Sequence, residues 1–113
     1  LGSVSPYVTR AVAHVAAHYK DDPSVAGVAR AVGISANHLG HLFDAALGMP
    51  VKEYIIKVRL LAARRLLLQT DDGLDVLAEE CGFVDGSHLS RLFLRYVGQR
   101  PGEYRRVRTE RSR

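Results

Sequence analysis

The stretch that decides the fold runs from Leu74 to Tyr104, LDVLAEECGFVDGSHLSRLFLRYVGQRPGEY, and it has an earlier counterpart from Val25 to Tyr54, VAGVARAVGISANHLGHLFDAALGMPVKEY. A shift of fifty positions superimposes His38, Leu39, Leu42, Phe43, Gly48, Glu53 and Tyr54 on His88, Leu89, Leu92, Phe93, Gly98, Glu103 and Tyr104. The turn between Gly82 and His88 is one residue longer than its counterpart, whereas the flanking segments match. We therefore interpret the repeat as two helix-turn-helix units.

Glycine and proline residues divide the chain into segments of helical length, and no stretch alternates apolar and polar residues for long. The sequence predicts an all-α fold of seven helices. Five of them run from Pro6, capped by Ser5, to near Asp21–Pro23; from Ser24 to Val32; from Ser35 to Leu47; from Val51 to about Thr70; and from Leu74 to Cys81. The sixth ends at Val97 and the seventh begins at Pro101. The two units thus cover 24–47 and 74–97, joined by a linker helix at 51–70 and followed by a basic tail at 107–113.

Length and composition are those of one soluble globular domain: 113 residues, 47% hydrophobic and 25% charged. No run approaches the ~18 apolar residues of a membrane span, and residues 1–20 lack a signal-peptide pattern. We therefore expect a cytoplasmic protein. A single cysteine, Cys81, excludes an internal disulfide and a cysteine-based zinc site, and we expect it to be buried as a small apolar residue. No cofactor is predicted.

Positive charge is concentrated at the C-terminal end. Residues 91–113 carry eight arginines and two glutamates, a net charge of +6, whereas residues 1–90 carry eight basic and ten acidic side chains, a net charge of −2. A basic end on a small domain predicts a polyanionic partner. Nucleic acid is the first candidate and anionic lipid the main competitor.

The second helix of each unit separates an apolar face from a polar one at 100° per residue. The apolar faces comprise Leu39, Leu42, Phe43, Ala46 and Leu47, and Leu89, Leu92, Phe93, Tyr96 and Val97; the polar faces comprise Asn37, His41 and Asp44, and Ser87, Arg91, Leu94 and Arg95. A helix that is apolar on one side and polar on the other can pack on its unit while it contacts DNA.

These polar residues have the chemistry of base recognition. Arg91 can donate to guanine O6 and N7, Asn37 can pair with the N6 and N7 edge of adenine, and Ser87 or His41 can contact several base edges. The helix starts at Ser35 and near Asp85–Ser87 offer N–H groups to phosphates. Side chains expected to hold the DNA backbone are Arg95, Arg100, Arg105 and Arg106.

From about Tyr7 to Arg106 the sequence resembles the bacterial AraC/XylS transcription regulators. The first motif is Val28-Ala29-Arg30-Ala31-Val32-Gly33-Ile34-Ser35, then Leu39, Leu42, Phe43, Gly48, Tyr54, Arg59, Ala63 and Leu66-Leu67. The more specific second motif comprises Ala78, Gly82-Phe83, Ser87, Leu89, Ser90, Arg91, Phe93, Gly98, Pro101, Tyr104 and Arg105.

The resemblance implies two recognition helices that enter successive major-groove segments of one duplex. It places base contacts at Asn37, Gly40, His41, Gly86, Ser87 and Arg91, and the matching backbone contacts include Ser35, His38 and His88. A linker helix of twenty residues is ~30 Å long, close to the ~34 Å repeat of DNA. An imperfect match would require the DNA to bend.

The first recognition helix departs from this pattern. It has no lysine or arginine, it carries Gly40 at a contact position, and it exposes Asp44. We therefore expect Arg91→Ala to lose more specificity than His41→Ala. Alternatively, Asn37 and neutral His41 contact bases while Lys52, Lys57, Arg64 or Arg65 supply nearby charge.

The sequence thus predicts sequence-specific binding of double-stranded DNA and transcription regulation, as an activator with RNA polymerase as a further partner. Because the chain opens at Leu-Gly-Ser, we expect the C-terminal domain of a larger regulator, monomeric in isolation and dimeric at full length.

A rival hypothesis is a protein-interaction module with weak, unspecific DNA affinity. A third is an enzyme or metal-binding domain that uses His14 and His18, although Val15 stands where a zinc protease has its glutamate. No catalytic motif is found, so we predict neither an enzyme nor a metal site.

Overall fold

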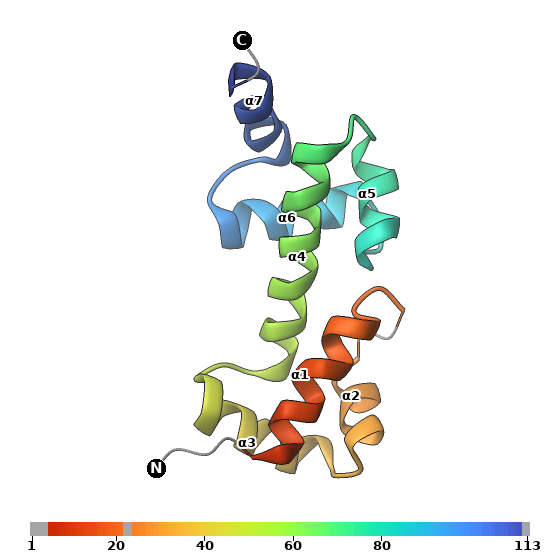
Figure 1. The fold of residues 1–113 in the computed structure, drawn as a ribbon, viewed down its shortest axis with the longest axis vertical. Helices are drawn as coiled ribbons and strands as arrows, with labels where there is room; N and C mark the ends of the chain where they lie inside the picture. Colours follow the sequence, from red (N-terminus) through yellow and green to blue (C-terminus); the bar gives the residue numbers. More distant parts are fainter. Residues whose placement is uncertain (1–4, 22–23, 112–113) are drawn as a thin grey trace. The chain divides into compact units, whose positions relative to one another are not determined.

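The computed structural model describes residues 5–21 and 24–111, the last four of them by their backbone alone. These residues form seven helices (Figure 1): α1 (Pro6–His18), α2 (Val25–Val32), α3 (Ala36–Leu47), α4 (Val51–Gln69), α5 (Leu74–Cys81), α6 (Gly86–Val97) and α7 (Pro101–Arg111). The predicted all-α fold and the order of its helices are confirmed. Helix α1 ends at His18, before the predicted Asp21–Pro23, of which Asp22 and Pro23 lie outside the described residues.

Short polar residues and glycines set the helix ends, as predicted. The side chains of Ser24, Ser35 and Asp85 accept hydrogen bonds from backbone N–H groups at the starts of α2, α3 and α6, over 2.9, 3.0 and 2.8 Å. Gly33 and Gly82 end α2 and α5 with φ of 83° and 89°, a left-handed conformation that glycine adopts without a steric penalty. Both helix-turn-helix turns therefore follow from local chemistry.

The chain divides between Val58 and Arg59 into two compact units, and α4 contributes residues to both. In unit 1, α1 packs on α2 and α3, and α2 packs on α3. Its core consists of Val8, Ala11, Val15, Val28, Ala29, Val32, Leu39, Phe43, Val51 and Ile55. The start of α4 thus closes the core of the first helix-turn-helix.

Unit 2 repeats this arrangement with the second half of α4. Helix α5 packs on α6, and α6 packs on α7. Its buried apolar residues include Leu60, Ala63, Leu67, Leu77, Ala78, Cys81, Phe83, Leu89 and Phe93. The rings of Phe93 and Tyr104 form a T-shaped pair with centroids 5.5 Å apart, and Phe43 and Tyr54 form one with centroids 5.3 Å apart in unit 1. Equivalent residues of the repeat therefore form equivalent aromatic contacts.

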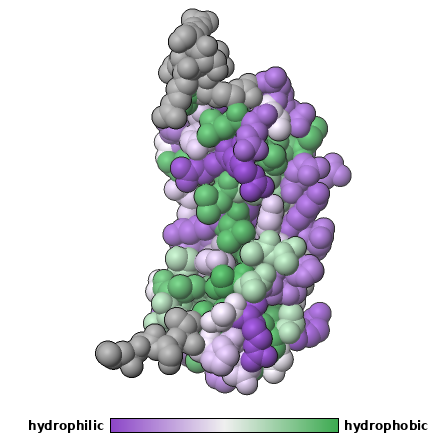
Figure 2. Space-filling view, in the orientation of Figure 1, coloured by the Kyte–Doolittle hydropathy of each residue, from purple (hydrophilic) through white to green (hydrophobic). Residues whose placement is uncertain are grey.

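Two residues predicted on the apolar face of the first recognition helix are exposed instead, and so is one leucine of α4. Ala46 and Leu47 end α3 at the surface, with Leu47 39% exposed, and Leu61 on α4 is 62% exposed. Helical spacing shows which residues share a face, but the width of the covered part depends on how far the neighbouring helices extend. Figure 2 shows apolar areas interspersed among polar ones on the face in view.

The buried residues include the single cysteine and one arginine. Cys81 is fully buried, as predicted for a small apolar residue. Arg59 is buried on α4, and desolvation lowers the pKa of its guanidinium. No helix among the described residues is both long and apolar enough to cross a membrane.

Candidate nucleic-acid interface

The predicted contact residues of unit 2 meet in one hollow. A cavity of about 400 Å³ lies between the start of α5 and the outer side of α6. Its lining consists of Leu74, Asp75, Gly86, Ser87, Ser90 and Arg91. Ser87 and Arg91 are both exposed, so their side chains are available to a ligand that enters the hollow.

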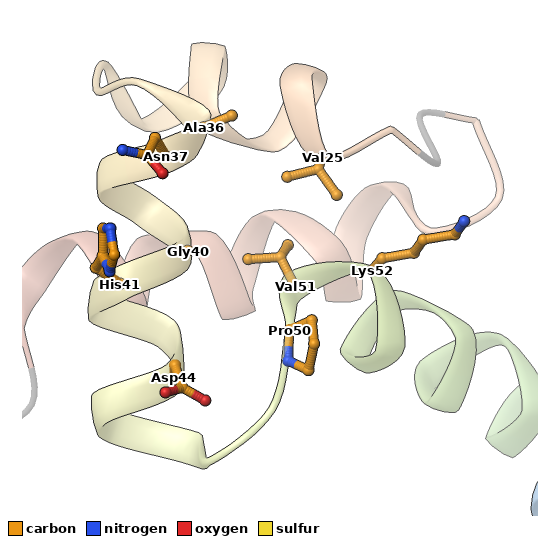
Figure 3. A pocket seen from close by; sticks show the side chains of 9 residues that line it. All are labelled: Val25, Ala36, Asn37, Gly40, His41, Asp44, Pro50, Val51 and Lys52. Carbon is orange, nitrogen blue, oxygen red and sulfur yellow. The ribbon is translucent and has the colours of Figure 1, made fainter.

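Unit 1 has a corresponding hollow of about 430 Å³. It is lined by Val25, Ala36, Asn37, Gly40, His41, Asp44, Pro50, Val51 and Lys52 (Figure 3). Asn37, His41 and Asp44 follow one another along α3, and Lys52 extends away from them at the start of α4. The first hollow thus presents an amide, an imidazole and a carboxylate from α3.

The two hollows occupy the same place in the repeat. Val25, Asn37, Gly40 and His41 in unit 1 correspond to Leu74, Ser87, Ser90 and Arg91 in unit 2. Arg91 replaces His41, so the second hollow has a permanent positive charge where the first has an imidazole. Four of the six predicted base contacts, Asn37, His41, Ser87 and Arg91, are therefore exposed on the recognition helices, and Gly40 is half-buried in the first hollow.

Gly86, the remaining predicted base contact, has a different position. It is buried, and its N–H donates to Asp75 Oδ1 at 2.8 Å. A Cβ built on Gly86 would lie 2.7 Å from that oxygen and 3.1 Å from Leu74 Cβ. The close approach of α5 to the start of α6 therefore requires glycine here, which gives Gly86 a packing role.

The two recognition helices, whose starts are both predicted to offer N–H groups to phosphates, begin with different charges around those groups. At α6 the N–H groups of Gly86 and His88 already donate to the carboxylates of Asp75 and Asp85, both over 2.8 Å. Two negative charges at this end repel a phosphate. At α3 the cap is the neutral Ser35 hydroxyl, and the first turn has no acidic residue. Only the α3 start keeps the charge pattern that favours an anion.

The two histidines predicted to contact the DNA backbone also differ. His38 is exposed, with its ring centroid 6.2 Å from that of Tyr7. His88 is half-buried, its Nδ1 accepts from the Val84 N–H at 3.3 Å, and its ring meets the Phe83 ring at 5.7 Å. The imidazole of His88 is thus held inside the turn of unit 2.

Three of the four predicted backbone arginines are exposed. The Arg95 guanidinium lies over the Tyr96 ring, 5.5 Å from its centroid. Arg100, Glu103 and Arg106 line a further hollow of unit 2, which shares Leu74 and Ser90 with the hollow around Arg91. The fourth, Arg105, is half-buried, and its Nε donates to the Leu67 carbonyl at 3.2 Å. Arg105 therefore ties α7 to α4.

This difference leads to a paired prediction. We expect Arg105→Ala to lower the free energy of unfolding by about 1–2 kcal/mol, because the Leu67 carbonyl loses a donor. Arg106→Ala should change stability by less than ~0.5 kcal/mol, because Arg106 is exposed. Urea unfolding followed by circular dichroism measures both. Equal stability of the two variants would contradict the structural role of Arg105.

Four side chains of α4 could supply positive charge near the first recognition helix: Lys52, Lys57, Arg64 and Arg65. They lie in different surroundings. Arg64 Nε donates to the Tyr104 hydroxyl at 3.3 Å, and its guanidinium lies 5.5 Å from the Tyr104 ring centroid. Lys57 and Arg65 are exposed, and Lys52 lines the first hollow. Lys52 is thus the one of these four side chains found in a described hollow with predicted base contacts.

Two further sequence predictions concern the histidine pair on α1 and the basic tail. The rings of His14 and His18 have centroids 4.5 Å apart on α1. No group of three or more histidine, cysteine, aspartate or glutamate residues that could hold a metal ion is found in the described part of the chain. In the basic tail at 107–113, the side chains from 108 onward lie outside the described residues.

The sequence does not predict Asp75 at the hollow around Arg91, which this residue lines. Asp75 precedes the second recognition helix by a full helix and a turn, and it reaches the hollow only because α5 packs on α6. The signal that could have found it is the pair of differences between the repeats, since Ala26 and Ala36 stand where Asp75 and Gly86 stand in the second copy.

Comparison with known proteins shows the family and the fold. A family model described as a helix-turn-helix domain matches residues 28–107. A transcriptional regulator from Chromobacterium violaceum with an AraC-type DNA-binding domain superposes with a TM-score of 0.85 at 33% identity, covering 91% of this chain and 92% of that one. The DNA-binding domain of AdpA, solved with a target DNA, superposes with a TM-score of 0.87 at 28% identity, covering 95% of this chain and 96% of that one.

Curated relatives are transcription regulators. The transcriptional activator NphR of a Rhodococcus species is 40% identical over 85 residues, which is 75% of this chain and 25% of NphR. The regulator ArgR of Pseudomonas aeruginosa is 31% identical over 108 residues, which is 96% of this chain and 33% of ArgR. The chain thus spans about a third or less of the length of these relatives.

Proposed function

This chain belongs to the AraC family of transcription regulators and is a DNA-binding domain, and from that premise we propose that each of its two hollows recognises bases in a major groove. Arg91 on α6 supplies the strongest base contact, to guanine, and Asn37 and His41 on α3 supply neutral contacts. The observation that carries the proposal is that equivalent repeat positions line both hollows and are exposed on both recognition helices.

The remaining contacts hold the DNA backbone. Arg95, Arg100 and Arg106 are exposed and positively charged, and Ser35 and His38 lie at the start of α3, where no carboxylate opposes a phosphate. Such contacts set the position of the protein on the duplex without reading its sequence. Arg105 and His88 contribute by holding the structure of unit 2 around Arg91.

The consequence of DNA binding that we propose is activation of transcription, with RNA polymerase as the protein partner and the bacterial cytoplasm as the place of action. The support is the relative NphR, a transcriptional activator that shares 40% identity with this chain. A transcription assay with purified polymerase and a promoter carrying the selected binding sequence tests this step. Unchanged transcript levels upon adding the full regulator would contradict it.

Selection from a random duplex library at near-physiological salt tests the DNA recognition itself. We expect an enriched sequence with two blocks, one for each hollow, and a preference of at least ~10³-fold over a scrambled duplex. Binding should weaken as salt rises, because phosphate contacts release counterions. Binding that weakens with salt but enriches no sequence would contradict base recognition while leaving an electrostatic DNA contact.

Comparison of the two recognition helices gives a second prediction. Arg91→Ala should reduce the affinity for the selected duplex by about 1–3 kcal/mol and relax the preference at one guanine, because a guanidinium contacts O6 and N7 together. His41→Ala should have a smaller effect, because an imidazole contacts a base edge through one ring nitrogen, whereas a guanidinium contacts it through two nitrogens. Titration of both variants against the selected and scrambled duplexes measures this. A larger loss for His41→Ala would reverse the proposed ranking.

A further inference from the structure

We propose that Asp75 is a second specificity-determining residue of unit 2, which accepts a hydrogen bond from the amino group of a cytosine beside the guanine that Arg91 contacts. The proposal rests on the proposed function, since it assigns a base contact within the same hollow. It adds a contact that comes from α5, the first helix of the helix-turn-helix, and not from the recognition helix α6.

The position of Asp75 is the first support. One hollow is lined by Asp75, Ser87, Ser90 and Arg91. A base pair that Arg91 contacts would therefore lie next to the Asp75 carboxylate. Asp75 is exposed, which leaves the carboxylate accessible to a ligand. The hollow therefore offers a positively charged donor and a negatively charged acceptor.

The hydrogen bond of Asp75 prepares it for this contact. Oδ1 accepts from the Gly86 N–H at 2.8 Å, which holds the carboxylate at the start of α6. Oδ2 has no hydrogen bond to another described residue, and no ion pair joins Asp75 to Arg91 within the described part of the chain. One oxygen thus orients the side chain while the other stays available, and the ordering entropy of the side chain is lost on folding and not on binding.

Base chemistry selects cytosine as the partner. In the major groove cytosine presents the N4 amino donor, whereas guanine presents the acceptors N7 and O6 and thymine presents the acceptor O4. Adenine presents an amino donor next to the acceptor N7, which repels a carboxylate. An acidic side chain therefore favours cytosine, while Arg91 favours guanine.

Unit 1 has neither the carboxylate nor the glycine that form this hydrogen bond in unit 2. Ala26 corresponds to Asp75, and Ala36 corresponds to Gly86. The glycine is what admits the carboxylate, because a Cβ at position 86 would lie 2.7 Å from Asp75 Oδ1. The pair Asp75 and Gly86 is thus a feature of the second hollow alone among the two described.

The test is selection from a random duplex library with the wild-type chain, Asp75→Asn and the control Glu79→Gln. The asparagine keeps an oxygen that accepts from the Gly86 N–H and removes the negative charge. Glu79 is exposed on the same helix and does not line the hollow, so Glu79→Gln removes one charge from α5 without changing the site. Titration of the selected duplex and of a duplex with the cytosine replaced by thymine then gives an affinity ratio for each protein.

We expect the wild type and Glu79→Gln to prefer the cytosine duplex by roughly tenfold, and Asp75→Asn to lose most of that preference. The ratio compares two duplexes with one protein, so a change in the folded fraction cancels. An unchanged ratio for Asp75→Asn, or an equal loss of affinity for both duplexes, would overturn the proposal and leave Asp75 as a support of α6 only. If the wild type itself enriches no sequence, the failure lies in the proposed function.

Discussion

Truncation of Phe93 to alanine is expected to lower the free energy of unfolding by about 3–5 kcal/mol, the largest effect of any substitution considered for this chain. Phe93 has 0% of its surface exposed and lies on the side of α6 that faces the core of unit 2, where it meets the ring of Tyr104 at 5.5 Å. Its removal leaves a cavity among residues that cannot close around it. Arg91 lies two positions earlier on the outer side of the same helix, so the proposed DNA contact of Arg91 depends on this packing.

Leu94 provides the matched control, because it is the next residue of α6 and is 45% exposed. Leu94→Ala should change the unfolding free energy by no more than ~0.5 kcal/mol. Urea unfolding followed by circular dichroism measures both variants, and titration with the selected duplex measures the effect on binding. A loss below ~1 kcal/mol for Phe93→Ala would show that the rest of unit 2 holds α6 without this ring.

Replacement of Gly86 by alanine is expected to lower the unfolding free energy by about 2–4 kcal/mol through overpacking and a weakened hydrogen bond. The new Cβ would lie 2.7 Å from Asp75 Oδ1, 3.1 Å from Leu74 Cβ and 3.2 Å from the Asp75 backbone nitrogen. The carboxylate can move, but the other two atoms belong to the start of α5 and shift only with the helix. Separation of α5 from α6 would also displace Asp75 from the hollow.

A glycine without close neighbours separates this effect from helix propensity. A Cβ at Gly102 in α7 would meet no heavy atom within 4 Å, so Gly102→Ala should be neutral or stabilise by up to ~1 kcal/mol. Thermal unfolding of the two variants beside the wild type tests the difference. A Gly86→Ala variant as stable as Gly102→Ala would contradict the packing role of Gly86.

Predictions that depended on contacts beyond one helix were less successful. Ala46, Leu47 and Leu61 fit the apolar spacing of α3 and α4 but are exposed, because no part of the described chain covers those turns. Arg105 fits a basic surface but donates to the Leu67 carbonyl 38 positions earlier. Charge and periodicity show what a residue can do, whereas its partner depends on which helices meet.

The sequence by itself determined the seven helices, the two helix-turn-helix units and the outward position of Asn37, His41, Ser87 and Arg91. These features depend on caps, glycines and apolar spacing that act within about one helical turn, so they can be derived from neighbouring residues. Only the tertiary structure decided that Asp75 reaches the start of α6, eleven positions away, and that Gly86 is buried beneath it. Such a contact exists because α5 packs closely on α6, and the distance between two helices is set by all the side chains that pack between them.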